Sequence, residues 1–484
     1  MPASPRTFLK VVACALVAIA LAGRGLAADQ PHQFRAGAAT SNITPPLGVS
    51  INGGMQDHPA LHIHDELHAR CLVLDDGRTK LAIVVNDSCM IPREVLDEAK
   101  RLASERTDIP VQNILCSATH AHSAPTAAAV FQSVPDKDYL KFLTQRIADG
   151  IARANYNLAP AKIGWGAGRE PNQVFNRRWR MKPGKPLLNP FGGEDQVRMN
   201  PGVKSPDLLE PAGPTDPEVP VLAVQSPDGK PIAVLANYSL HYVGGTGLGH
   251  ISADYYGAFA DRLEELMHPG RQDPPFVAIL SNGTSGDINN IDFRGEQKRA
   301  TGPYAQIQLV ADAVATEVAR VYQGIQFRDW APLSVRQAEI TLGVRKPSAT
   351  EVAAAREIMA KAKTAPRMET REEIYAHETV QMNDYPAQVP IILQAMRIGD
   401  LAITAIPGEV FVETGLELKS KSPIKPLFNI ELANGYNGYL PTPAQHQLGG
   451  YETWRAKSSY LEVDASTKIT AKLFELLGQL ATQP

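Results

Sequence analysis

Residues 114–125 read ILCSATHAHSAP, an apolar run that passes directly into a cluster of polar side chains. The first four residues, Ile114 to Ser117, have the length and composition of a short strand. His120 and His122 follow in a His-x-His pattern, which suits zinc and similar metals because they bind imidazole well. Loop histidines that only form hydrogen bonds would produce the same pattern. The stretch therefore predicts a strand that ends in a functional loop, and it leaves metal binding open.

Four other strand-like runs end in polar clusters in the same way. They are residues 232–238, followed by His241; residues 276–280, followed by Asp287 and Asn289; residues 401–406, followed by Glu409; and residues 427–431, followed by Tyr439. Ligand sites of open α/β sheets lie outside the carboxyl ends of the strands, so we expect these five ends to meet in one cleft. Taken singly, the signals have simpler explanations. Glu409 can neutralise the N-terminus of a following helix, and Asp287 can form a turn.

The arrangement of apolar residues along the chain is typical of an α/β protein. Residues 94–104 and 139–156 have the spacing of amphipathic helices, and such segments alternate with short β-rich runs such as 81–85. Residues 219–225 and 232–238 flank an Asp-Gly turn, which predicts an antiparallel hairpin. We expect mixed β-sheets flanked by helices rather than a helix bundle or a β-sandwich.

Two segments interrupt this alternation. Residues 181–220 are dense in proline and glycine, which predicts a long ordered loop without regular elements. Residues 347–378 are charged and helix-forming but have little apolar surface at a consistent period, which predicts an exposed helical insertion. We expect residues 29–484, including these two segments, to form a single domain.

The N-terminus has the three parts of a secretory signal peptide. Arg6 and Lys10 precede an uncharged stretch from residue 11 to residue 23, and small residues up to Ala28 follow it. The apolar stretch is shorter than the roughly 20 residues that cross a membrane. We therefore expect residues 1–28 to be removed and the mature protein to be secreted or periplasmic, without stable membrane insertion.

Composition and charge narrow the class of protein. The 484 residues are 44% hydrophobic and 20% charged, which is ordinary for a globular protein. The formal net charge of −3 provides no basic field that would hold nucleic acid. Three cysteines remain after removal of the signal peptide, and Cys71, Cys89 and Cys116 all lie in apolar, strand-like contexts. We expect buried free thiols, with one disulfide as the alternative.

Taken together, the polar clusters resemble the catalytic domain of the neutral/alkaline, non-lysosomal ceramidases, zinc amidases that cleave the N-acyl bond of ceramide. The matching motifs are residues 36–46 (AGAATSNITPP), 119–123 (THAHS), 176–178 (NRR), 215–218 (TDPE), 286–287 (GD), 407–409 (PGE) and 439–451, with the strand before His241. Their order and rough spacing are more specific than any single motif, and they cover most of the mature chain. The resemblance implies a ceramidase-like catalytic domain over residues 29–484.

The resemblance also implies roles for individual residues. By this resemblance the zinc ligands are His120, His241, Glu409 and Tyr439. Tyr451, twelve residues after the last of these, would be the tyrosine that stabilises an oxyanion, and His122 and Arg177 would line the active site. Two imidazoles, one carboxylate and one phenol form a plausible hydrolytic zinc site, because an oxygen ligand leaves room for water.

One position departs from the family pattern. Where the family has Gly-Asp-Val-Ser-Pro-Asn, with the serine regarded as nucleophile, this chain reads GDINN from Gly286 to Asn290. Asn289 occupies the serine position, and an amide nitrogen is no nucleophile. Ser285 lies four positions earlier and would need a rearranged loop to replace the serine. The resemblance fades near residue 475, so we expect no C-terminal immunoglobulin-like domain of the kind that the family carries.

These observations predict an exported zinc-dependent hydrolase that cleaves an amide or ester bond of a small molecule or sphingolipid-like lipid with metal-activated water. His122 or Asp287 would orient the water or carry its proton, and Tyr451 would donate to the oxyanion. Asn289 would hold substrate or water by hydrogen bonds. One alternative is a catalytically inactive protein that keeps the cleft to bind a glycan or a lipid. Another is a metal-dependent phosphodiesterase or a sulfatase-like enzyme. The oligomeric state is left open.

Overall fold

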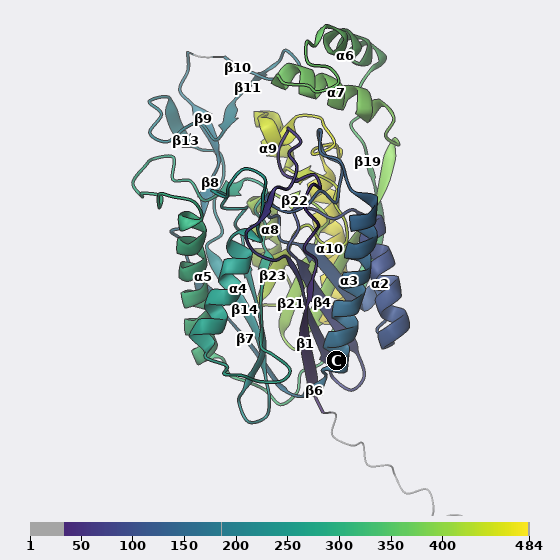
Figure 1. Ribbon diagram of the computed structural model, residues 1–484, viewed down its shortest axis with the longest axis vertical. Coiled ribbons are helices and arrows are strands. Elements are labelled where there is room, and N and C mark those ends of the chain that lie inside the picture. Colours follow the sequence, from purple (N-terminus) through teal and green to yellow (C-terminus); the bar gives the residue numbers. More distant parts are fainter. Residues whose placement is uncertain (1–32, 185, 483–484) are drawn as a thin grey trace, which may run out of the picture. The chain divides into compact units, whose positions relative to one another are not determined.

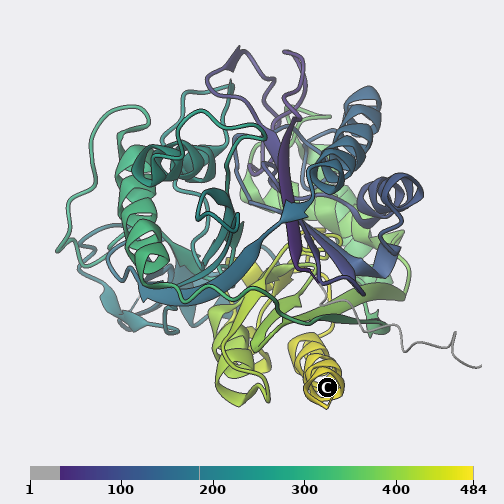
Figure 2. The ribbon, with the colours of Figure 1, turned by 90° about the horizontal axis from the view of Figure 1, so that it is seen from below.

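The structure is a computed structural model that describes residues 33–184 and 186–482. The segment expected to be a signal peptide, residues 1–28, lies outside these described residues. Most strands of the described chain belong to three larger sheets, each covered on one face by helices (Figure 1, Figure 2). This arrangement confirms the expected α/β class of mixed sheets flanked by helices.

The first sheet has the strand order β5-β4-β3-β1-β6. Its strands are β1 (Arg35–Asn42), β3 (His68–Asp75), β4 (Lys80–Asn86), β5 (Ile114–Ala118) and β6 (Ala159–Pro160). Strands β4 and β5 are parallel, whereas the other neighbours are antiparallel. Helices α2 (Arg93–Thr107) and α3 (Lys137–Tyr156) cover its outer face and join in one hydrophobic cluster with it.

The second sheet has the strand order β17-β15-β14-β7. Its strands are β7 (Lys162–Arg169), β14 (Glu218–Gln225), β15 (Pro231–Tyr238) and β17 (Val277–Asn282). Strands β14 and β15 form the antiparallel hairpin that the Asp-Gly turn predicts, and β15 then pairs in parallel with β17. Helices α4 (Asp254–Met267) and α5 (Ala305–Gly324) cover its outer face.

The third sheet has the strand order β19-β20-β21-β23. Its strands are β19 (Leu333–Gly343), β20 (Gln388–Ile398), β21 (Leu401–Ala405) and β23 (Leu427–Ile430). Strands β21 and β23 are parallel, and the remaining pairs are antiparallel. Helices α8 (Val412–Lys421) and α10 (Ala465–Ala481) pack on its outer face.

The inner faces of the three sheets share one hydrophobic core. Leu81 and Ile83 of the first sheet, Leu235 of the second and Ile403 of the third belong to the same buried cluster. Side chains alternate between the faces of a strand, so the intervening Val84 points to the outer cluster under α2 and α3. In the view of Figure 2 the helices accordingly lie outside and the three sheets meet at the centre.

Each sheet contributes one parallel pair of strands, and these pairs position the site. The pairs are β4 with β5, β15 with β17, and β21 with β23. Further short parallel and antiparallel pairs brace the loops after them: β22 (Glu409–Val410) with β24 (Tyr439–Leu440), β18 (Ile288–Asn289) with β8 (Phe175–Asn176), and β2 (His62–Ile63) with β16 (His250–Ile251). The polar segments singled out in the sequence therefore follow parallel strands of three sheets that share one core.

The proline-rich segment differs from the loop expected for residues 181–220. It contains the short strands β10 (Leu187–Leu188), β11 (Glu194–Asp195), β12 (Val197–Met199) and β13 (Leu208–Pro211), and β12 and β13 pair with β9 (Arg178–Met181). Most of the prolines lie between these strands; Pro211 ends the edge strand β13, where no ladder donor is needed, and Pro220 lies within β14. The expectation that proline excludes regular elements here was wrong.

Residues 347–378 lie mostly in two helices, α6 (Ala349–Lys361) and α7 (Arg371–Asn383). Each begins with a capping box, in which Ser348 pairs with Glu351 and Thr370 pairs with Glu373. Helix α7 is not fully exposed, because Tyr375 is buried edge-on against the ring of Trp454. The remaining short helical segments are α9 (Pro443–Leu448) and the 3₁₀ turns η1 (Val111–Asn113) and η2 (Tyr451–Thr453).

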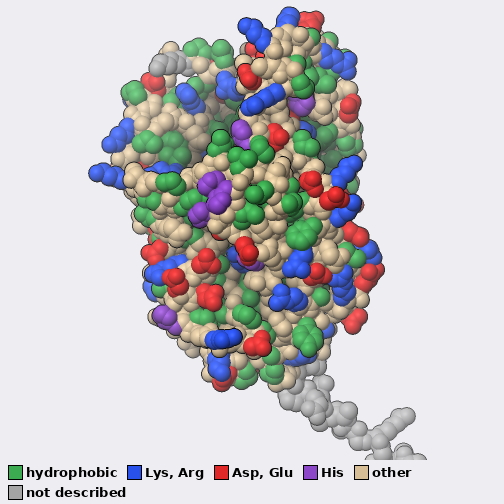
Figure 3. All heavy atoms as spheres, in the orientation of Figure 1, with side chains coloured by type: hydrophobic (Ala, Val, Ile, Leu, Met, Phe, Trp, Pro, Cys, Tyr) green, Lys and Arg blue, Asp and Glu red, His purple; other side chains and the backbone are tan. Residues whose placement is uncertain are grey.

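The cysteines and the surface agree with a globular interior. Cys71, Cys89 and Cys116 are buried free thiols, as predicted. Within the described ranges, no helix combines the length and the apolar character needed to cross a bilayer. On the face that Figure 3 shows, basic and acidic side chains are interspersed and form no extended field of one sign.

Candidate metal and active site

Two histidines and one glutamate from all three sheets meet in one buried group. His120 follows β5, His241 follows β15, and Glu409 begins β22 just after β21. The Nε2 atoms of His120 and His241 are 3.0 Å apart, and Glu409 Oε2 lies 3.2 Å and 3.8 Å from them. All three side chains are at most 2% exposed. Their ligand atoms lie close enough together to hold a single metal ion.

Backbone carbonyls hold both imidazoles with the same nitrogen turned inward. His120 Nδ1 lies 2.8 Å from the carbonyl oxygen of Cys89, and His241 Nδ1 lies 3.1 Å from that of Ser285. A carbonyl only accepts, so each Nδ1 carries the proton and each Nε2 keeps a lone pair. Two lone pairs that face each other at 3.0 Å repel unless a cation lies between them. Metal-binding histidines in proteins are oriented by this kind of hydrogen bond.

The Glu409 carboxylate supplies negative charge to the same point. Its Oε1 accepts a hydrogen bond from the hydroxyl of Tyr436 at 2.9 Å. Its Oε2 is buried and has no hydrogen-bond partner among the described residues. A buried carboxylate oxygen without a donor is costly, so this atom also favours a cation beside it. The donor set of two neutral imidazoles and a carboxylate therefore fits a divalent metal such as zinc.

The pKa shifts of the histidines follow from the same geometry. Burial, followed by the charges of His120 and Arg177, holds the pKa of His122 and of His241 well below the ordinary value. Burial also acts to lower the pKa of His120, but the Glu409 carboxylate outweighs it and the pKa lies well above the ordinary value. With no cation bound, Nε2 of His120 would therefore take up a proton beside Glu409; a metal ion at the group would supply that positive charge and leave both imidazoles neutral.

His122 and Tyr439 lie beside this group. His122 Nε2 is 3.0 Å from His120 Nε2, and its ring stacks on Tyr242 with 3.7 Å between the centroids. Tyr439 is paired in register with Glu409 across the parallel strands β22 and β24. The sequence-predicted residues His120, His122, His241, Glu409 and Tyr439 are thus brought together by the fold.

A buried network of two arginines and one glutamate holds Tyr439 from the other side. Arg177 donates to the Tyr439 hydroxyl at 3.0 Å and to the carbonyl oxygen of Gly286 at 2.8 Å. Glu452 accepts from Arg177 at 2.8 Å and from Arg178 at 2.7 Å, and all three side chains are at most 5% exposed. Arg177 is therefore oriented by Glu452 and in turn orients Tyr439.

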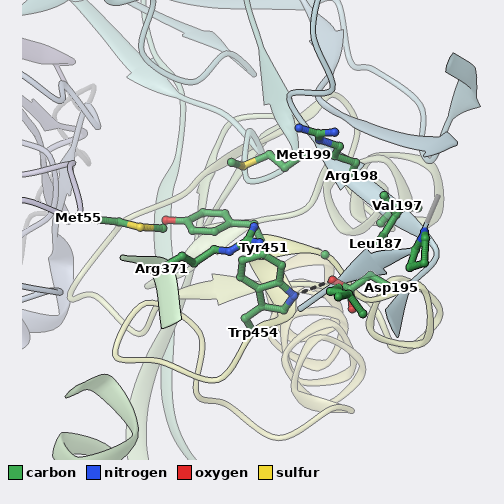
Figure 4. Close-up of a pocket in the computed structure, with 12 residues that line it drawn as sticks. Met55, Leu187, Asp195, Val197, Arg198, Met199, Arg371, Tyr451 and Trp454 are labelled. Atoms are coloured by element: carbon green, nitrogen blue, oxygen red, sulfur yellow. Dashed lines mark hydrogen bonds between the residues drawn. The ribbon is translucent and has the colours of Figure 1, made fainter. Parts of the chain in front are cut away.

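Tyr451 connects the buried group with a cavity of about 420 Å³ (Figure 4). Its ring lies edge-on to that of Tyr439 with 5.8 Å between the centroids. Burial first, and then the charge of Glu409, raises the pKa of Tyr451 well above the ordinary value, so its hydroxyl keeps its proton. Met55 lines the same cavity, and its loop approaches the group because Gly53 lies directly against the His122 ring.

A family model described as neutral/alkaline non-lysosomal ceramidase, N-terminal, matches residues 34–308, more than half of the chain. The chain belongs to the neutral/alkaline non-lysosomal ceramidase family. This match begins with β1 and ends in α5, so it includes the loops of His120 and His241.

Individual ceramidases are similar over different lengths. Neutral ceramidase of Pseudomonas aeruginosa is 26% identical over 314 residues, which cover 61% of this chain and 41% of that protein. Neutral ceramidase B of Dictyostelium discoideum is 23% identical over 240 residues, 47% of this chain and 31% of that protein. Neutral ceramidase A of the same organism is 21% identical over 506 residues, which cover 86% of this chain and 67% of that protein. The chain therefore spans less than half of the first two relatives.

Solved ceramidase structures share the fold. The crystal structure of neutral ceramidase from Pseudomonas aeruginosa superimposes with a TM-score of 0.70 at 18% identity, and covers 93% of this chain and 75% of that one. A structure titled "Ceramidase complexed with C2" gives a TM-score of 0.68 at 17% identity, with the same coverage. This likeness confirms the expected ceramidase-like architecture.

The two other sequence-predicted site residues of this ceramidase-family chain have fully engaged side chains. Asp287 accepts hydrogen bonds from Val412 N at 2.9 Å and from Asn176 Nδ2 at 2.8 Å. Asn289 donates to Asn200 Oδ1 at 2.7 Å and accepts from the backbone of Ile291 at 3.0 Å. Both side chains therefore hold the loop after β17 in place.

The serines near the family's nucleophile position are also engaged. Ser285 donates to Glu431 Oε1 at 2.6 Å, and Ser281 donates to the carbonyl oxygen of Ala236 at 3.0 Å. Both serines are fully buried. Neither hydroxyl is presented to the cavity that Tyr451 lines.

Sequence reasoning missed four residues that support the site. They are Cys89, Tyr436, Glu431 and Glu452. Tyr436 lies three residues before Tyr439 in the same GYNGY stretch, so its phenol was a visible candidate partner for a carboxylate. The adjacent Arg177 and Arg178 also signalled that a buried acid must lie nearby, since buried charges need partners. The chain positions of Cys89 and Glu431 carried no signal of their own.

Proposed function

We propose that this chain is a zinc-dependent hydrolase that cleaves the N-acyl amide bond of a ceramide-like lipid and acts outside the cytoplasm. The single observation that supports the zinc site is that Nε2 of His120 and Nε2 of His241 both lie close to Oε2 of Glu409, which is buried and has no hydrogen-bond donor among the described residues. The neutral ceramidases to which the chain is similar support the amide and the lipid. The signal-peptide pattern of residues 1–28 supports export.

The residues proposed to hold the metal are His120, His241, Glu409 and Tyr439. Bound zinc would act as a Lewis acid on the substrate carbonyl and would lower the pKa of a water molecule toward neutrality. Tyr439 joins the ligand set in this proposal because its register with Glu409 and its hydrogen bond from Arg177 hold the phenol at the group.

His122 is proposed to accept and return the proton of the attacking water. A neutral imidazole can accept a proton. His122 Nε2 faces the group at 3.0 Å from His120. Asp287 is given no proton-transfer role, because Val412 and Asn176 occupy its two oxygens.

Tyr451 is proposed to donate a hydrogen bond to the oxyanion that develops on the amide carbonyl. Its hydroxyl stays protonated because of the raised pKa, and its side chain lines the cavity next to the group. Water is the proposed nucleophile because Asn289 has no nucleophilic atom and the buried hydroxyls of Ser281 and Ser285 are engaged.

The test is a metal-dependence assay on the purified exported protein with a matched panel of substrates. The panel contains an N-acyl amide with a long chain, the corresponding ester and a phosphodiester, each assayed after chelation and after zinc is restored. Amide hydrolysis that is lost on chelation and recovered with zinc supports the proposal. Cleavage of the phosphodiester alone would instead indicate a phosphodiesterase. Lipid binding without turnover of any substrate would indicate the binding protein that was considered as the alternative.

A further inference from the structure

The cavity beside Tyr451 is lined by apolar side chains and by two arginines; Figure 4 shows Arg198 next to Met199, and Arg371 next to Tyr451 and Trp454. Its described lining residues are Met55, Pro186, Leu187, Leu188, Asp195, Val197, Arg198, Met199, Arg371, Gly450, Tyr451 and Trp454. Aliphatic, methionine and tryptophan side chains suit an apolar chain. The two arginines, Arg198 and Arg371, suit an acidic group in addition to that chain.

Both arginines lack an acidic partner. Among the described residues, the structure records no ion pair and no side-chain hydrogen bond for Arg198 or Arg371; both side chains are exposed, and Arg371 also lies over the Trp454 ring. Arg455, close by in sequence to Trp454, is by contrast paired with Glu351 at 2.8 Å. The guanidinia of Arg198 and Arg371, which line one cavity, are therefore available to a ligand.

Asp195, the acid that lines this cavity, is already committed to other partners. Its Oδ2 accepts from Trp454 Nε1 at 2.8 Å, and its Oδ1 accepts from Asn189 Nδ2 at 3.2 Å. Asp195 therefore holds the tryptophan in the wall and is not paired with either arginine. The described lining residues then carry two positive charges against one negative charge.

Arg371 lies in the wall of the cavity. It is the first residue of α7, and its guanidinium lies over the Trp454 ring at 5.1 Å from the centroid. The N-terminus of this helix is already satisfied by the capping box of Thr370 and Glu373, with Glu372 in the same turn, so the helix end adds no further demand for an anion. Figure 4 shows the Arg371 side chain directed toward Tyr451 and Trp454. The guanidinium itself is therefore the group that an acidic ligand would meet here.

We infer that the substrate of the proposed hydrolase is an N-acyl amide that carries an acidic group, bound by Arg198 and Arg371. Its apolar chain would lie against Met55, Val197 and Met199, while Tyr451 faces the amide carbonyl. This inference rests on the proposed function for the identity of the bond that is cleaved. Recognition of the acidic group rests on the cavity alone, because arginine pairs with carboxylates and sulfonates through its planar fork.

The proposed recognition of an acidic group by Arg198 and Arg371 is tested by measuring binding and hydrolysis separately. Three probes share one dodecanoyl chain: N-acyl glycine with a carboxylate, N-acyl taurine with a sulfonate, and the neutral N-acyl glycine methyl ester. Binding is followed by the fluorescence of Trp454 and the other tryptophans, or by calorimetry, and it does not require turnover. The full mature protein is compared with Arg198→Gln, Arg371→Gln and the double variant. Arg356→Gln is the control, because Arg356 is an exposed arginine of α6 that does not line the cavity.

The expected result is that the wild-type protein binds an acidic probe about tenfold more tightly or better than the methyl ester. Each single variant should lose most of this preference, the double variant should lose all of it, and Arg356→Gln should keep it. A preference for the carboxylate or for the sulfonate identifies the acidic group. Equal binding of acidic and neutral probes by the wild-type protein, or an unchanged preference in the double variant, would overturn the inference. Acid-selective binding without hydrolysis would instead contradict the proposed function and leave the anion site standing.

Discussion

At the scale of single residues, the site depends on which nitrogen each histidine turns inward. The Nδ1–H groups of His120 and His241 donate hydrogen bonds to the carbonyl oxygens of Cys89 and Ser285. The Nε2 atoms of both histidines therefore face Glu409. A backbone carbonyl can impose this tautomer but a sequence pattern cannot reveal it. The chemistry of the group is therefore set by atoms that belong to neighbouring loops.

Replacement of His241 tests the metal group directly. We expect about one zinc per chain in the wild-type protein, because four proposed ligands from separate loops meet only in the folded chain. His241→Ala should remove the metal and lower the thermal stability, since the remaining ligands lose the cation that they surround. Elemental analysis with thermal melting measures both effects. His62→Ala is the control, because His62 is exposed and does not belong to a group of side chains able to hold a metal. Full metal occupancy in His241→Ala would show that the ligand assignment is wrong.

Replacement of Asn289 tests the proposed nucleophile. Asn289→Ala should reduce turnover without abolishing it, because Asn289 has no nucleophilic atom and its hydrogen bonds with Asn200 and Ile291 hold the loop after β17 in place. Asn289→Ser, which introduces the residue of the family pattern, should form no covalent acyl intermediate and is assayed on ceramide beside the wild-type protein. Steady-state kinetics and mass spectrometry of trapped protein are the measurements, with Asn383→Ala as an exposed control. An acyl adduct on Ser281 or Ser285 in the wild-type protein would overturn attack by water.

At the scale of secondary structure, Asp287 links the loop after β17 to the start of α8. Its Oδ1 accepts from the backbone of Val412, the first residue of that helix. Burial raises the pKa of Asp287 to about 6, although hydrogen bonds from Val412 and Asn176 and the charge of Arg178 oppose the shift, while Glu413 adds to it. The helix start is thus capped by a carboxyl group that titrates in an accessible range.

This carboxyl group predicts a pH dependence of stability. The unfolded chain releases the Asp287 proton near pH 4, whereas the folded chain keeps it until about pH 6. The folded state therefore binds more protons in this window, and the free energy of unfolding falls as the pH rises through it. A shift of this size corresponds to about 3 kcal/mol at 1.36 kcal/mol per pKa unit. Denaturant unfolding of the wild-type protein and of Asp287→Asn from pH 4 to pH 7 should show the wild-type protein losing this amount relative to the variant. Parallel pH profiles of the two proteins would contradict the prediction.

Glu452, in the turn η2, holds the two buried arginines beside the candidate active site. It is the shared carboxylate partner of the buried Arg177 and Arg178. Glu452→Gln should lower the free energy of unfolding by about 3 to 5 kcal/mol, because it leaves two buried guanidinia without a countercharge. Glu98→Gln, in an exposed pair with Arg101, is the control and should change stability little. Urea unfolding measures both variants, and equal stabilities would show that the network is dispensable.

At the scale of the whole molecule, three sheets with one shared core bring the site together. In each sheet one parallel pair of strands ends near the same point, and the loops of His120, His241 and Glu409 follow these strands.

Export of the whole protein is a further prediction at this scale. N-terminal sequencing of the exported protein should find a start just after Ala28, and fractionation should recover it outside the integral-membrane fraction. A protein that still begins at Met1 would contradict the signal-peptide prediction.

Local patterns were sufficient for the elements that the chain builds from neighbours. Apolar spacing predicted α3, the Asp-Gly turn predicted the β14–β15 hairpin, and polar clusters after strands predicted which loops bring His120, His241 and Glu409 together. These features depend on residues close together in sequence, whose periodicity and turn chemistry act locally. The short strands β12 and β13 among the prolines of residues 181–220 were missed. They form because they pair with β9, and composition does not show which strand a segment pairs with.

The assembly of the site required contacts between distant parts of the chain. The pairing of Glu409 with Tyr436, of Glu452 with both arginines and of Arg371 with Trp454 joins residues whose loops meet only when three sheets pack on one core. Burial in that core, and not residue type, also sets the pKa of Asp287 and leaves Glu409 Oε2 without a donor. Residue identity thus supplied the chemical groups and their order along the chain, whereas distance, burial and tautomer came from packing, because those quantities depend on neighbours that are remote in sequence.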